Sequence, residues 1–127
     1  MPITYRIERE RGLIFTTCSG QVTLPQVMAH FDALQRDPEC PRRLDVLLDL
    51  AGVTSLPEGP QIRAAAERVG LVQDIVFGAC AIVATREALF GMARMFEVLA
   101  RGHFAAIRTF RQRKEAEEWL DAAPGTW

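Results

Sequence analysis

The chain has 127 residues, of which 49% are hydrophobic and 24% are charged, and its 15 basic side chains nearly balance its 16 acidic ones. This size and composition predict a single globular domain over residues 1–127, whose core needs neither disulfides nor metal ions. The balanced charge argues against a nucleic-acid partner. The sequence has no apolar run of about 18 residues that could cross a membrane and no N-terminal secretory pattern, so we expect a cytoplasmic protein without an integral membrane segment.

The first residues predict an antiparallel hairpin. Residues 3–8 alternate apolar and polar side chains, which is typical of a half-buried strand, and residues 13–19 continue as a second strand. Arg11 and Gly12 supply a tight turn between the two strands.

Strands and helices alternate after the hairpin. Thr23 and Gln26 have the spacing of a capping box, so a helix is expected to begin there and to end near Asp37. The apolar run LDVLLDL at residues 44–50 indicates a strand that is buried on both faces, in the middle of a covered sheet. The remaining expected elements are a helix at 59–73, a strand at 78–85, a helix at 86–101 capped by Thr85, a strand at 104–110 and a helix at 113–122. This order predicts an α/β fold, a mixed sheet of about five strands flanked by four helices.

The residue types that usually carry catalysis or hold metals are scattered along the chain. Cys18, Cys40 and Cys80 lack CxxC spacing, which favours reduced thiols over a disulfide framework or a zinc site. His30 is expected on the solvent face of the first helix and His103 in a turn, so they form no metal site or catalytic dyad. A glycine-rich phosphate loop is also missing after every expected strand. We therefore predict no catalytic residues, no metal, no cofactor and no enzymatic activity.

Several segments together resemble a known family. They are the LDVLLDL strand, the Gly-Val-Thr-Ser turn after it, the GACAIVAT strand, the LFGMARMFE helix and the closing AIRTFRQRKEAEEWL. In their order they resemble the SpoIIAA-like group of the STAS superfamily, relatives of the anti-sigma-factor antagonists, over about Ile3 to Leu120. The resemblance implies a SpoIIAA-like α/β fold and a non-catalytic regulatory or protein-interaction module with a regulatory protein as partner.

Two features of the family do not carry over to this chain. The antagonists are switched by phosphorylation of a serine in an Asp-Ser-Ser-Gly stretch after the third strand. Here the corresponding stretch reads Leu56-Pro57-Glu58-Gly59, with Glu58 at the phosphoacceptor position, which argues against a phospho-switch. Similar proteins are also grouped by name with Sec14-type lipid-binding domains, but this chain is shorter than a full lipid-transfer domain, so a lipid cavity does not follow.

Polar side chains are expected at the carboxyl ends of the parallel strands, where α/β proteins bind ligands. The predicted rim consists of Asp49, Thr54, Ser55, Glu58 and Arg86. It could bind a small anionic or lipid-like ligand or a partner loop. The alternative is that these residues only cap helices and form turns, with Asp49 accepting backbone hydrogen bonds.

The helix at 86–101 carries apolar side chains on two sides. At about 100° per residue, the side expected to face the sheet contains Leu89, Met92, Phe96 and Leu99, and the polar side contains Glu87, Arg94, Glu97 and Arg101. Phe90 and Val98 lie within the polar side. Apolar residues beside Arg94 suggest a protein interface, and so a homodimer or higher oligomer. The alternative is that a loop or a neighbouring helix covers them. The leading hypothesis is therefore a self-associating interaction module, and ligand binding at the rim is the second.

Overall fold

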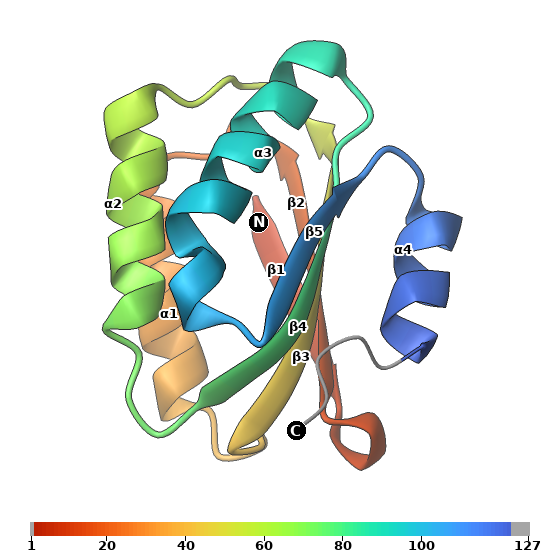
Figure 1. Cartoon of the computed structure of the whole chain (residues 1–127). Coiled ribbons are helices and arrows are strands. Elements are labelled where there is room, and N and C mark those ends of the chain that lie inside the picture. Colours follow the sequence, from red (N-terminus) through yellow and green to blue (C-terminus); the bar gives the residue numbers. More distant parts are fainter. Residues whose placement is uncertain (1, 123–127) are drawn as a thin grey trace.

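The computed structural model describes residues 2–122, which form five strands and four helices (Figure 1). In chain order these are β1 (Ile3–Glu8), β2 (Leu13–Gly20), α1 (Leu24–Arg36), β3 (Arg43–Val53), α2 (Gly59–Gly70), β4 (Val76–Val83), α3 (Glu87–Ala100), β5 (Ala106–Phe110) and α4 (Arg113–Asp121). Short 3-10 turns, η1 (Arg9–Arg11) and η2 (Arg101–His103), precede β2 and β5. None of these helices is long and apolar enough to cross a membrane.

The predicted hairpin is confirmed. β1 and β2 pair antiparallel, with Ile3 opposite Cys18 and Glu8 opposite Leu13. Gly12, at the end of the turn, has a φ of +59°, and a Cβ atom there would lie 3.2 Å from the carbonyl oxygen of Arg43. Both the left-handed backbone and the close approach favour glycine at this position.

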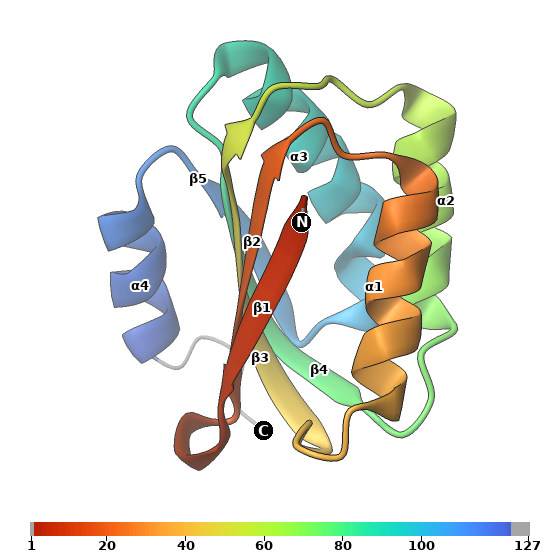
Figure 2. The same ribbon diagram turned by 180° about the vertical axis from the view of Figure 1, so that it is seen from behind.

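The sheet has the strand order β1-β2-β3-β4-β5, and every pair from β2 onward is parallel. Each connection between parallel strands therefore leads to the next position in the sheet, always in the same direction. Because such crossovers are right-handed, α1, α2 and α3 all lie on one face of the sheet. Figures 1 and 2 show these three helices together, with α4 alone on the opposite face. The predicted mixed α/β sheet with four helices is confirmed.

The ends of several elements follow from local hydrogen bonds. The side chain of Thr23 accepts a hydrogen bond from the backbone N–H of Gln26, and the Gln26 side chain accepts one from Thr23, so the predicted capping box is confirmed. α2 ends at Gly70, earlier than predicted. α3 begins at Glu87 with Arg86 rather than Thr85 at its N-cap, and the Arg86 side chain makes no capping hydrogen bond.

β3 is the central strand, as predicted, but its two faces are not equally buried. Leu47, under α4, is 1% exposed, and Leu44 is fully buried on the other face. Val46, Leu48 and Leu50 are only half-buried. The prediction of full burial on both faces is therefore wrong for these three residues, because they border a pocket beneath the helices.

Candidate functional site

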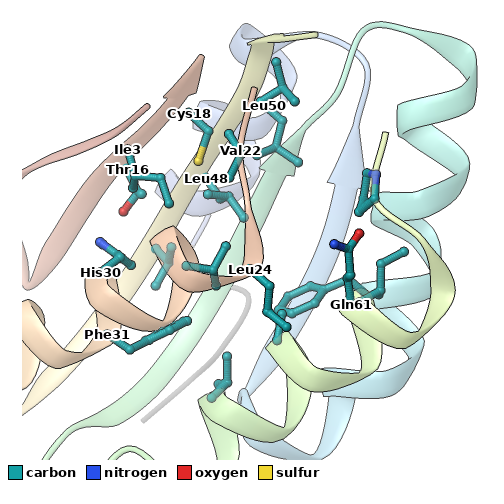
Figure 3. A pocket seen from close by; sticks show the side chains of 18 of the residues that line it. Ile3, Thr16, Cys18, Val22, Leu24, His30, Phe31, Leu48, Leu50 and Gln61 are labelled. Carbon is teal, nitrogen blue, oxygen red and sulfur yellow. The ribbon is translucent and has the colours of Figure 1, made fainter. Parts of the chain in front are cut away.

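A pocket of about 210 Å³ lies between the sheet and the helices above it, lined mainly by α1 and α2 and also by Leu89 and Phe96 of α3 (Figure 3). Its walls are largely apolar and include Ile14 and Leu48 from the strands, Val27 and Phe31 from α1, and Ile62 from α2. For comparison, an engineered apolar cavity of about 150 Å³ binds benzene. None of the described residues that line the pocket is an Asp, Glu, Lys or Arg. The site is therefore suited to an apolar ligand.

The pocket follows from the alternation of side chains along the strands and from the size of the residues that face it. In β2 and β3 every second side chain points toward the helices. Several residues on this face are small, including Cys18 and Cys80 on the sheet and Ala65 on α2. Small residues on facing elements leave space unfilled. The small residues are visible in the sequence. The sequence does not show, however, that the small residues of the sheet and those of α2 face each other.

The mouth of the pocket lies at the carboxyl ends of the parallel strands. Thr23 and Gln61 line the pocket and are exposed, and Ser55, which also lines it, is half-buried. The Ser55 Oγ accepts a hydrogen bond from the Val22 N–H at 3.1 Å, and the Thr54 N–H donates to the Gly20 carbonyl at 2.9 Å. These two hydrogen bonds join the loop after β2 to the loop after β3 beside the mouth.

His30 lies in the pocket rather than on the solvent face of α1, so that prediction was wrong (Figure 3). Its position is about 40° around the helix from Leu34, so it lies at the border of the buried stripe. The ring contacts Tyr5 and Phe31 edge-on, with ring centroids 5.5 and 5.3 Å apart. Burial lowers the pKa of His30 from 6.5 to about 4. The imidazole is therefore neutral at neutral pH.

The cysteines are not activated thiols. Burial, with a smaller contribution from the charge of Asp49, raises the pKa of Cys18 to about 11. Burial raises the pKa of Cys80 still further, and burial together with Asp37 raises the pKa of Cys40. Thiols with raised pKa values are poor nucleophiles and poor metal ligands at neutral pH. Among the described residues, no group of three or more His, Cys, Asp or Glu side chains could hold a metal ion.

The residues of the predicted rim are divided between the two faces of the sheet. Ser55 lines the pocket, whereas Asp49 points toward α4, where it accepts a hydrogen bond from Arg113 at 3.2 Å and another from the Ala51 N–H. The Arg86 guanidinium donates to the Val53 carbonyl at 2.9 Å. The Asp49–Ala51 hydrogen bond is a turn contact of the kind that the alternative interpretation describes, whereas the contacts of Arg113 and Arg86 join separate elements.

The other two rim residues lie at the loop after β3. Glu58 occupies the N-cap of α2, where its backbone N–H donates to the Gln61 side chain at 2.9 Å, and Thr54 is exposed. Ligand binding by the rim as a whole stays a prediction.

The outward side of α3 is partly as predicted. Val98 is 58% exposed and Met95 is 43% exposed, and Arg94, which directly precedes Met95 and lies one turn before Val98, is exposed as well. Phe90 is half-buried, because the Arg111 guanidinium lies 3.9 Å from its ring centroid. The apolar surface that remains open on α3 is therefore formed by Met95 and Val98. Interface formation by Phe90, Arg94 and Val98 stays a prediction.

Glu97 belongs to the buried side of α3, which the helical wheel did not predict. It is 7% exposed, and its Oε1 accepts hydrogen bonds from the Thr109 N–H at 2.9 Å and the Thr109 hydroxyl at 3.0 Å. β5 is the edge strand, so the Thr109 N–H has no neighbouring strand on its outer side. The carboxylate replaces that missing strand as an acceptor. A helical wheel sorts residues by polarity alone, so it places a charged residue such as Glu97 on the solvent side even when the residue is buried as a hydrogen-bond acceptor.

Comparisons with known proteins address the fold. No protein-family model and no curated protein matches the chain. Among solved structures, the chain is similar to an uncharacterised protein of the DUF3478 family with a SpoIIAA-like fold, from Shewanella loihica PV-4. The sequences are 16% identical, the match covers 93% of this chain and 91% of the other, and the TM-score is 0.57. The chain therefore has the SpoIIAA-like fold that the sequence resemblance implied.

Proposed function

We propose that this protein binds a small, largely apolar ligand in the pocket between the sheet and helices α1 and α2. The observation that supports the proposal is an open, apolar-lined pocket of about 210 Å³. Protein interiors are normally close-packed, and apolar side chains that face an open pocket lack packing partners and remain in contact with water. A ligand that fills the space supplies the missing contacts.

The pocket limits the size of the ligand. Scaling from benzene in a cavity of about 150 Å³ gives a buried portion of about eight non-hydrogen atoms. The mouth beside Ser55 and Gln61 is open, so a longer ligand can extend outward from there.

Toluene provides a direct test because it is small and apolar. We expect saturable amide chemical-shift changes in NMR spectra at residues that line the pocket, such as Ile14 and Val27. An Ala65→Leu variant fills part of the space and is expected to abolish binding while stabilising the protein by about 1 kcal/mol.

The matched control is Ala88→Leu, the same change at an exposed position of α3, which should leave toluene binding intact. The proposal fails if toluene does not bind the wild-type protein, or if it binds Ala65→Leu equally well.

A second candidate function is self-association through the outward side of α3. It is supported by Met95 and Val98, two exposed apolar residues that follow Arg94 by one and four positions in α3. Exposed apolar residues beside arginine are typical of protein interfaces. Its test is the oligomeric state in solution. Under either candidate we propose a non-catalytic, cytoplasmic regulatory module. A regulatory protein partner would recognise either the outward side of α3 or the ligand-bound state of the pocket.

A further inference from the structure

The largely apolar pocket contains a buried hydroxyl group that has no hydrogen-bond partner among the described residues. Thr16, from β2, lines the pocket and is 4% exposed, and its side chain makes no hydrogen bond to any described residue. Within the described part of the chain, no side-chain nitrogen or oxygen is both sealed from solvent and unpaired. The Thr16 hydroxyl must therefore be open to the space of the pocket, where a ligand can reach it.

His30 supplies a second polar group to the same pocket. It enters from α1, on the wall opposite β2 (Figure 3). Its ring makes edge contacts with Tyr5 and Phe31, but neither ring nitrogen hydrogen-bonds to a described residue. A neutral imidazole carries one N–H donor and one acceptor nitrogen. Thr16 and His30 together thus present unused donors and acceptors to the pocket.

We infer that the ligand is an uncharged molecule with an apolar body and one hydroxyl or carbonyl oxygen, and that it binds with this oxygen inward, at Thr16 and His30. The inference rests on the proposed function, because it specifies the ligand of the same pocket. The apolar body would lie against side chains such as Val27, Phe31 and Leu48.

The surroundings favour an uncharged group over a carboxylate. Transfer of an ionised carboxylate into an apolar site is far more costly than transfer of a hydroxyl that finds a hydrogen-bond partner. No Lys or Arg among the described residues lines the pocket to compensate a negative charge. A hydroxyl or carbonyl group, by contrast, can accept a hydrogen bond from Thr16 without such compensation.

Three probes of similar shape separate these alternatives: toluene, benzyl alcohol and benzoate. Dissociation constants are measured by NMR titration for the wild-type protein and for Thr16→Val, which keeps the shape of the side chain and removes the hydroxyl. We expect Thr16→Val to weaken benzyl alcohol binding about fivefold, as for one lost hydrogen bond, and to leave toluene binding within about twofold. Benzoate should bind neither protein.

Two further variants control for indirect effects. Thr17→Val makes the same change at the next residue of β2, which is exposed, and should not alter the binding of benzyl alcohol. Thr16→Ser retains a hydroxyl and should keep the difference between benzyl alcohol and toluene.

The outcomes distinguish this inference from the proposed function. If toluene does not bind, the proposed function is overturned, and the inference that rests on it is overturned as well. If toluene and benzyl alcohol both bind but Thr16→Val changes their affinities by the same factor, or if benzoate binds as well as benzyl alcohol, only the inference about the polar group is overturned.

Discussion

At the scale of single residues, His30 shows how burial changes the role of a side chain. Its ring packs against Tyr5 and Phe31 and shares the pocket with Thr16. A charged side chain on the solvent face of a helix keeps its hydration. A protonated imidazole at the position of His30 would lose most of it, so burial disfavours the protonated form. The residue therefore couples the stability of the fold to pH.

The sign of this pH dependence follows from the two pKa values. Burial lowers the pKa of His30 from 6.5 to about 4, so the unfolded chain binds its proton more readily than the folded protein does. The free energy of unfolding should be unaffected by His30 above pH 6.5 and should fall by up to about 3 kcal/mol as the pH decreases from 6.5 to 4.

Urea unfolding at pH 7 and at pH 5 measures this effect. His30→Gln has no titrating group at this position, so it should lose less stability between the two pH values than the wild-type protein. Equal losses in the two proteins would mean that the His30 imidazole remains solvated in the folded state.

At the scale of elements, β3 separates two differently packed layers. Leu47 points toward α4 and packs with Leu13 and Val83, whereas Leu48 points into the pocket. Adjacent leucines of one strand thus lie in a tightly packed core and at the wall of an open space.

We predict different costs for the same truncation at these two positions. Leu47→Ala should decrease the free energy of unfolding by about 3 kcal/mol, because it opens a cavity in packed surroundings. Leu48→Ala should cost about 1 kcal/mol, because this side chain already borders unfilled space and loses fewer contacts. Equilibrium urea denaturation without added ligand measures both values, and equal losses would contradict the asymmetry.

The same elements show what the sequence could predict. The hairpin, the Thr23–Gln26 capping box and the central position of β3 each depend on residues close together in the chain, and each is confirmed. The positions of His30 and Glu97 were predicted wrongly, because each depends on what lies across from its helix. The pocket was missed for the same reason, since it is formed by facing residues of separate elements.

At the scale of the whole molecule, the order of the strands decides where function can reside. Successive parallel neighbours place α1, α2 and α3 on one face (Figure 2). The pocket lies beneath this layer, lined mainly by α1 and α2 and also by Leu89 and Phe96 of α3. α3 is the remaining helix of this layer, and its outer side carries exposed apolar residues. Ligand binding and self-association therefore concern different surfaces of one layer and can be tested independently.

Self-association predicts a change of oligomeric state in a single variant. The wild-type protein should be a dimer or larger in light scattering at concentrations on the order of tens of micromolar, a range typical of transient contacts. Val98→Asp should be monomeric, because a charge is costly in an apolar interface. The matched control is Leu71→Asp, at an apolar residue that is 70% exposed in the loop after α2, which should behave as wild type. A monomeric wild type would exclude this candidate.

The hydrogen bonds of Glu97 have a further consequence for how copies of the chain can meet. The free side of an edge strand offers N–H groups to any other extended chain, which is the usual origin of strand addition and of aggregation. At β5 the carboxylate of α3 already accepts the Thr109 N–H, and the helix lies alongside. An extended peptide would have to displace a buried acid before it could pair there. The β5 edge is thereby protected at Thr109 against the addition of a further strand.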